Sequence, residues 1–178
     1  MQPETILATR RIYDGRVVSL RVDDVRTPGG LETRREIVEH HGAVALIPID
    51  DAGRVLLVRQ YRHAAGRVMI EVPAGTLEPG EDPAACAARE LLEETGCTAA
   101  RFDRIGGIHV SPGFCTEYIH LFRATGLVRG EARPEADEDI EIEAVPWDEA
   151  VRRVRDGEIQ DAKTVAALLL ADSLHKNA

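Results

Sequence analysis

The segment 75–97 concentrates the residues of this sequence that could do chemistry. It reads GTLEPGEDPAACAARELLEETGC and holds six acidic residues. Glu90 and Glu94 are four residues apart, so on a helix both side chains project from one face, and Glu93 borders that face. Arg89 can pair with Glu93, but one arginine cannot neutralise three carboxylates. Such a cluster predicts a bound cation, and oxygen ligands select a hard one, Mg²⁺ or Mn²⁺.

The residues around this cluster favour the helix that would present it. Asp82 is a good N-cap, Pro83 suits the first helical position, and Gly96 suits a left-handed C-cap. Residues 84–95 are mostly strong helix formers, and the leucines and alanines among them indicate tight packing. The alternative is that the acidic residues form only a solvated helix face.

The spacing of this segment resembles the Nudix box, G-x5-E-x7-R-E-U-x-E-E-x-G-U, in which U is bulky and apolar. Gly75, Glu81 and the run 89–96 match every fixed position. The last position holds Cys97 where Ile, Leu or Val is usual, and cysteine is itself a small hydrophobe. The resemblance implies an α+β fold, an α/β/α sandwich around a mixed sheet. It also implies hydrolysis of a nucleoside diphosphate linked to another moiety.

The resemblance also implies roles for single residues. Glu90 and Glu94 match the usual metal ligands, and Glu93 matches a further ligand or an orienting carboxylate that takes part in catalysis. Glu81 matches a position that supports the helix and sometimes reaches a metal through water, and the backbone carbonyl of Ala74 matches another ligand. Metal ions held there, Mg²⁺ with Mn²⁺ as a substitute, would bridge a pyrophosphate and offset its charge.

Segments outside the box resemble the ADP-ribose pyrophosphatase branch of this family. They are TRREIVE at 33–39, VRQYR at 58–62, EVPAG at 71–75, SPGF at 111–114 and GEIQDA at 157–162. The likeness implies hydrolysis of ADP-ribose to AMP and ribose 5-phosphate. The box is expected to contact only the pyrophosphate group. Three other compounds that contain this group therefore remain alternative substrates: FAD, NADH and GDP-mannose. A non-catalytic ADP-ribose sensor is the alternative from another class, and the intact box glutamates argue against it.

Six residues outside the box are candidates for substrate binding, and each also has a purely structural interpretation. A planar guanidinium suits phosphate oxygens, although each arginine could equally be a solvated surface residue. By the resemblance, Glu117 contacts the terminal ribose, and Phe114, beside a Pro-Gly turn, lines the pocket. An arginine of the pair Arg34 and Arg35 reaches the partner subunit's site. The six are Arg62, Glu117, Gly113, Phe114, Arg34 and Arg35.

The acidic run at 135–139 predicts a solvated loop from its charge alone. In the branch that the sequence resembles, a glutamate of this loop acts as the general base or positions the attacking water. A base must come within hydrogen-bonding reach of that water, and loop closure can bring it there. We expect Glu138 to take this role, with Glu135 as the second candidate; if neither does, the metal and Glu93 activate the water.

Composition and charge exclude several classes of protein. The 178 residues suit one globular domain, and a net charge of −9 argues against a duplex-binding surface built on phosphate neutralisation. No apolar run approaches the ~20 residues that span a bilayer, and the N-terminus lacks the order of a secretory signal. Three cysteines without close pairing predict no disulfide framework. We therefore expect a cytoplasmic protein that binds neither nucleic acid nor membrane.

Strand patterns set residues 1–40 apart as an N-terminal arm, and the resemblance implies a Nudix hydrolase domain over residues 41–178. The arm is predicted as antiparallel strands, with a hairpin of 18–22 and 33–39. Its apolar face cannot be buried by the arm alone, so we expect a homodimer formed through it. In the domain, strands are predicted at 43–49, 55–58, 68–72, 104–110, 118–125 and 140–145, the first two as a hairpin, and helices at 84–95, 146–156 and 162–174.

Overall fold

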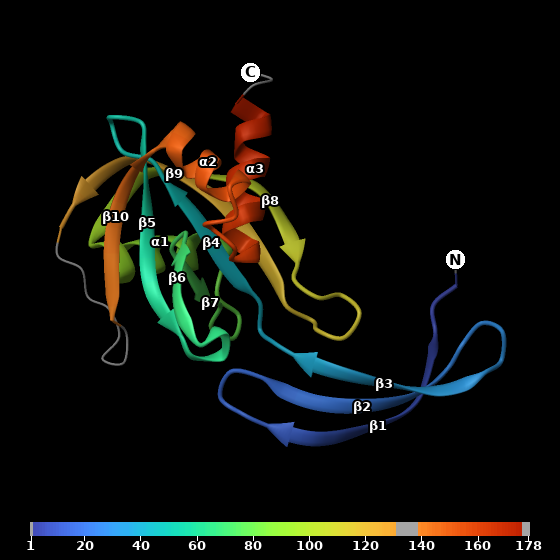
Figure 1. The fold of residues 1–178 in the computed structure, drawn as a ribbon. Helices are drawn as coiled ribbons and strands as arrows, with labels where there is room; N and C mark the ends of the chain where they lie inside the picture. The colour runs from blue at the N-terminus through green and yellow to red at the C-terminus, as the bar shows by residue number, and fades with distance from the viewer. Residues whose placement is uncertain (1, 131–138, 176–178) are drawn as a thin grey trace. The chain divides into compact units, whose positions relative to one another are not determined.

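The computed structural model describes residues 2–130 and 139–175, and its elements form two units (Figure 1). The first unit comprises Met1–Gly42 and His109–Tyr118, and the second comprises Ala43–Ile108 and Ile119–Ala178. The segment 109–118 thus belongs with the N-terminal strands, although it lies far from them in the sequence.

The first unit is built on a meander of three antiparallel strands. They are β1 (Thr5–Asp14), β2 (Ser19–Arg26) and β3 (Glu32–Glu39), paired in that order. The expected hairpin of 18–22 with 33–39 is confirmed by the β2–β3 pairing. The Val38 N–H donates to the carbonyl of Phe114 at 2.8 Å, and the Val38 carbonyl accepts from the Thr116 N–H at 2.9 Å. These two bonds tie the segment 109–118 to β3.

The described residues of the second unit form two sheets. The first has the strand order β7-β4-β9-β8, in which β4 is parallel to β9 and antiparallel to β7. The second has the order β10-β5-β6, and its pairs are antiparallel. The strands are β4 (Ala43–Pro48), β5 (Arg54–Arg62), β6 (Arg67–Glu71), β7 (Ala74–Thr76), β8 (Cys97–His109), β9 (Tyr118–Arg129) and β10 (Ile140–Pro146), and a 3₁₀ turn, η1 (His63–Ala65), follows β5.

The expected hairpin of 43–49 with 55–58 is wrong. β4 and β5 lie in different sheets, and they part at an isolated bridge between Ile49 and Val55. Every residue of β4 is buried, which is typical of a strand covered on both faces. Because both faces of such a strand are apolar, its residues show no alternation. The sequence pattern therefore does not indicate whether the strand pairs with the next strand in a hairpin or with a parallel strand from elsewhere in the chain.

In the described part of the second unit there are also three helices: α1 (Pro83–Thr95), α2 (Trp147–Arg155) and α3 (Ala162–His175). The predicted caps of α1 are confirmed. The Asp82 carboxylate accepts hydrogen bonds from the N–H groups of Ala84 and Ala85, at 2.9 and 3.1 Å, and Gly96 ends the helix with a φ of 67°. Among the described residues, no helix combines the length and the apolar character needed to cross a membrane.

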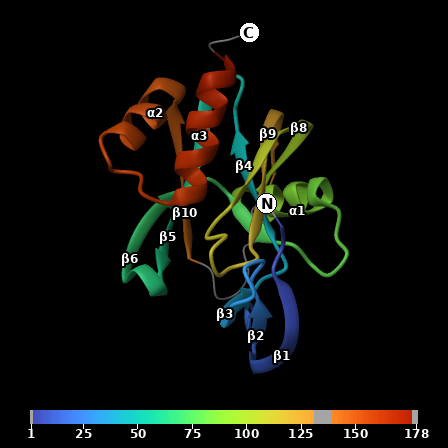
Figure 2. The same cartoon turned by 90° about the vertical axis from the view of Figure 1, so that its right-hand side faces the viewer.

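The helices cover the β4 sheet from both sides (Figure 2). Ala45 and Ile47 point into a core shared with α2 and α3. Val44 and Leu46 point the other way, into a core shared with α1. Because side chains alternate along a strand, one central strand supports two cores. The result is the α/β/α sandwich around a mixed sheet that the Nudix resemblance implies.

Candidate active site

The centre of the candidate site is the contact between α1 and β7. Glu90 and Glu94 lie on one face of α1 and are 9% and 4% exposed. The N–H of Ala74 donates to Oε2 of Glu94 at 3.1 Å. Gly75 leaves the space that the Glu90 carboxyl group fills, because a Cβ at Gly75 would lie 1.8 Å from the Glu90 carboxyl carbon. The first position of the box is therefore glycine because strand and carboxylate approach so closely.

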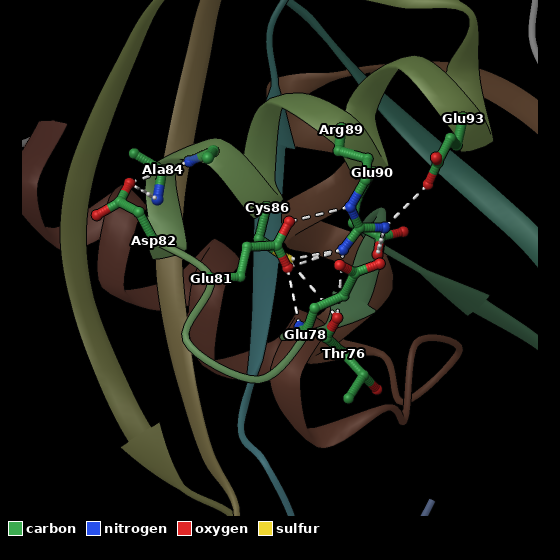
Figure 3. Close-up of polar contacts among 10 residues, drawn as sticks. Thr76, Glu78, Glu81, Asp82, Ala84, Cys86, Arg89, Glu90 and Glu93 are labelled. Atoms are coloured by element: carbon green, nitrogen blue, oxygen red, sulfur yellow. Dashed lines mark hydrogen bonds and ion pairs between the residues drawn. The ribbon is translucent and has the colours of Figure 1, made fainter. Parts of the chain in front are cut away.

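Arg89 holds the other carboxylates of the box (Figure 3). Its Nε and Nη2 donate to the two oxygens of Glu81, at 3.0 and 3.1 Å. Its Nη1 donates to Glu90 at 2.6 Å and to Glu93 at 3.0 Å. One guanidinium therefore meets three of the carboxylates of the box.

These contacts determine how the groups ionise. The hydrogen bonds from Arg89 outweigh desolvation and lower the pKa of Glu81 to about 2. The same bonds raise the pKa of Arg89 above its ordinary value. Burial raises the pKa of the neighbouring Cys86 thiol to about 12. At neutral pH the cysteine is thus a neutral thiol, while Glu81 and Arg89 are both charged.

The donors at this contact fit a hard divalent cation. Within the described part of the chain, no group of three or more His, Cys, Asp or Glu side chains is placed to hold a metal ion. Mg²⁺ does not require such a cage, because it binds proteins through one or two carboxylates and takes its remaining oxygens from water and substrate phosphates. The buried carboxylates of Glu90 and Glu94, set against the glycine gap in β7, are oxygen donors of the kind that such a partial site requires.

Arg62 is the substrate-binding candidate that lies in the same unit as the box. Its Nε and Nη2 donate to the two oxygens of Glu71, each at 2.8 Å. These hydrogen bonds raise the pKa of Arg62, and the negative charge of Glu94 adds to the effect. The guanidinium therefore lies within electrostatic range of a box glutamate.

The other five substrate-binding candidates belong to the first unit. Arg34 and Arg35 each form an ion pair with an acidic side chain of that unit, at 3.0 and 2.6 Å. A carboxylate oxygen of Glu117 lies 3.9 Å from a ring nitrogen of a histidine. Phe114 is exposed, on the loop that also carries Gly113. The six candidates are thus divided between the two units.

Glu135 and Glu138, the two candidates for the general base, lie outside the described residues. Their roles stay predictions from the sequence.

Glu71 and Lys163 are two further candidates that the sequence motifs do not single out. Glu71 is 1% exposed, and Lys163 donates to one of its oxygens from 92 residues further along the chain. The one signal that points to Glu71 is a charged residue inside the otherwise apolar run 68–72, because a buried charge needs a partner. The identity of that partner follows only from the fold.

Known proteins are similar to this chain in sequence and in fold. A family model described as the NUDIX domain matches residues 39–168. An ADP-ribose pyrophosphatase of Bacillus subtilis (strain 168) is 42% identical over 93% of this chain and 90% of its own. A methanol dehydrogenase activator of Bacillus methanolicus has the same identity and coverage. An ADP-ribose pyrophosphatase of Mycobacterium tuberculosis is 43% identical over 93% of this chain and 81% of its own.

A solved structure has the same arrangement of elements. The crystal structure of an ADP compounds hydrolase matches with a TM-score of 0.88 and covers 99% of this chain and 96% of its own. Its sequence is 22% identical, so this similarity shows the fold alone. Sequence relatives, family model and fold agree with the intact box at the α1–β7 contact, and the chain belongs to the Nudix family.

Proposed function

We propose that this Nudix protein is a pyrophosphatase that hydrolyses ADP-ribose to AMP and ribose 5-phosphate. The observation that carries the reaction type is the buried pair Glu90 and Glu94 against the β7 backbone, which provides a place for the cation that a pyrophosphate requires. The choice of ADP-ribose is supported by two ADP-ribose pyrophosphatases that are 42% and 43% identical over 93% of this chain.

Nudix hydrolases generally use a divalent metal, and here we propose Mg²⁺, with Mn²⁺ able to replace it. Glu90, Glu94 and the carbonyl of Ala74 would hold it, and Glu93 would be a further ligand or orient the attacking water. Glu81 would support the helix through Arg89. When bound, the metal would offset the charge of the pyrophosphate and lower the pKa of the attacking water.

The protein's own groups position the reactants and move the proton. Water attacks one phosphorus, the bond from that phosphorus to the bridging oxygen breaks, and the other phosphate leaves. Glu138, or failing that Glu135, accepts the proton of the attacking water. Arg62 binds phosphate oxygens, for which a guanidinium has the right donor geometry. By the resemblance, Glu117 would contact the terminal ribose and Phe114 would line the pocket.

Product analysis by chromatography tests this reaction. The purified protein is incubated with ADP-ribose, FAD, NADH and GDP-mannose, each with Mg²⁺ and each with excess EDTA. We expect AMP and ribose 5-phosphate from ADP-ribose with Mg²⁺ and no turnover with EDTA. Faster cleavage of another compound would change the substrate, and tight binding of ADP-ribose without cleavage would make the protein a sensor. Full turnover in EDTA would contradict the metal requirement.

Two matched variants test the base. Glu138→Gln should lower kcat by ~10²–10⁴-fold and leave KM and the Mg²⁺ requirement nearly unchanged, because a general base contributes by that factor. Glu135→Gln is the control on the same loop and should behave as the wild type. The reverse result would assign the role to Glu135. If neither variant loses activity, the water is activated by metal and Glu93 alone.

We further propose that the protein is a homodimer formed through the strands β1–β3. All ten residues of β1 are exposed, and among them Ile6 and Tyr13 are each 58% exposed. Apolar residues on a long strand favour pairing with another chain. Through this pairing Arg34 and Arg35 would reach the partner subunit's site. Light scattering should give twice the chain mass at micromolar concentration, and Ile6→Asp should shift the mass toward the monomer. A monomeric wild type would contradict the proposal.

We place the reaction in the cytoplasm. The three cysteines, Cys86, Cys97 and Cys115, are all free thiols, as expected for a reducing compartment. Fractionation of cells followed by immunoblotting tests this location, and recovery in a secreted fraction would contradict it.

A further inference from the structure

A buried carboxylate joins three segments of the second unit. Glu71, the last residue of β6, is 1% exposed, and both of its oxygens accept hydrogen bonds. Arg62, at the end of β5, donates to them through Nε and Nη2, each at 2.8 Å. Lys163, in the first turn of α3, donates to Oε2, and its Nζ also lies 3.0 Å from Asp161. One carboxylate therefore connects an arginine at a strand end to a lysine at a helix start.

The same helix start is bonded to the backbone that leads into the box. Thr164 accepts a hydrogen bond from the N–H of Val72 at 2.9 Å. Two residues later, the N–H of Ala74 donates to Glu94. The beginning of α3 thus fixes both the approach to β7 and, through Glu71, the side chain of Arg62.

Arg62 is held along one edge of its guanidinium group. Among the described residues, its Nη1 donates no hydrogen bond, and the side chain is 40% exposed. The negative charge of Glu94 also acts on this guanidinium and helps to raise its pKa. A guanidinium that is already ordered loses less side-chain entropy when it binds a phosphate oxygen.

We propose that Glu71 and Lys163 are positioning residues that hold Arg62 ready to bind a diphosphate. This inference rests on the proposed function, in which Arg62 binds phosphate oxygens. Buried ion networks seldom stabilise a fold more than well-packed apolar residues would, so orientation of Arg62 gives this network a use that stability alone does not. Lys163 contributes by holding Oε2 of Glu71, the same oxygen to which Nη2 of Arg62 donates.

Calorimetric titration with ADP in the presence of Mg²⁺ tests the inference without relying on turnover. Glu71→Gln keeps the shape of the side chain and removes its charge. It should raise the Kd for ADP about tenfold, as expected for the loss of hydrogen bonds between charged groups. Lys163→Gln should weaken binding in the same direction by a smaller factor. In an Arg62→Ala background, neither substitution should weaken binding further, because residues that act through one another are not additive.

A second arginine clamp provides the matched control. Arg153 of α2 donates through Nη1 and Nη2 to both oxygens of Glu143 on β10, at 3.1 and 2.9 Å. Glu143→Gln should change the melting temperature and leave the affinity for ADP unchanged. If Glu71→Gln does not fold, Lys163→Gln alone and in the Arg62→Ala background decides the question.

Two results would overturn the inference. One is a variant of Glu71 or Lys163 that melts earlier but binds ADP like the wild type. The other is a loss of affinity that multiplies with the loss in Arg62→Ala, because the network would then act independently of the arginine. A wild-type protein that binds ADP but does not cleave ADP-ribose would overturn the proposed function. The comparison of ADP affinities among the variants would still test the role of Glu71 and Lys163.

Discussion

The substitution Gly75→Ala tests whether the position of the Glu90 carboxylate matters for activity. A Cβ on residue 75 would lie 1.8 Å from the carboxyl carbon of Glu90 and 1.8 Å from its Oε1, whereas ordinary contact begins at 3.4 Å. The carboxyl group would have to retreat by about 1.6 Å, the difference between these two distances. Because it ends a flexible side chain, it can do so by changing rotamer while α1 and β7 stay in place.

The predicted effect on stability is small. Moving Glu90 breaks its hydrogen bond with Arg89, and a bond between charged groups contributes ~1.5–3 kcal/mol. Replacing glycine with alanine lowers the conformational entropy of the unfolded chain, which raises the free energy of unfolding by ~0.4–1 kcal/mol. The variant should therefore remain folded, with a free energy of unfolding lower by ~1–2 kcal/mol, which urea denaturation followed by circular dichroism measures.

The predicted effect on activity is large. A misplacement of about 1 Å at a reacting centre can cost ~10²-fold in rate, so kcat/KM for ADP-ribose should fall by about that factor. The Mg²⁺ concentration that gives half the maximal rate should rise. Gly29→Ala is the control, because an added Cβ there would meet its nearest neighbour at 4.0 Å. A folded Gly75→Ala enzyme within about threefold of the wild type would refute the requirement for Glu90 at this place.

Three other outcomes follow from the contacts around the box. The pKa of Glu81 is lowered from 4.5 to about 2, so its ionised form stabilises the fold fully above pH 4.5 and this contribution disappears as the pH falls through about 2. The difference in unfolding free energy between wild type and Glu81→Gln should therefore shrink between these two values, and a constant difference would contradict the assignment. Asp82→Ala removes the N-cap and should lower the free energy of unfolding by ~1 kcal/mol without changing kcat; a thermal melt and a rate assay check both parts. Glu94→Gln should weaken Mg²⁺ binding by ~10–100-fold or more while the protein stays folded, and an unchanged Mg²⁺ dependence of the rate would remove Glu94 from the ligand set.

The sequence by itself determined the features that depend on neighbouring residues. The bounds of α1 follow from Asp82, Pro83 and Gly96, whose effects act within one helical turn. The placement of Glu90 and Glu94 on one face follows from helical spacing alone. The reaction class was accessible for the same reason, because the chemistry of the box lies within 23 consecutive residues.

Only the tertiary structure decided which distant segments meet. The buried strand β4 pairs with β7 and β9 rather than with β5, although β5 follows it directly in the sequence. The Glu90 carboxyl group fills the space at Gly75, and Lys163 reaches Glu71 across 92 residues. These contacts depend on how the faces of sheets and helices pack. An apolar residue indicates that it will be buried, and a buried charge indicates that it will be paired. The type of residue does not indicate which partner it will contact. Burial is non-directional, and the fold as a whole determines which residues come together.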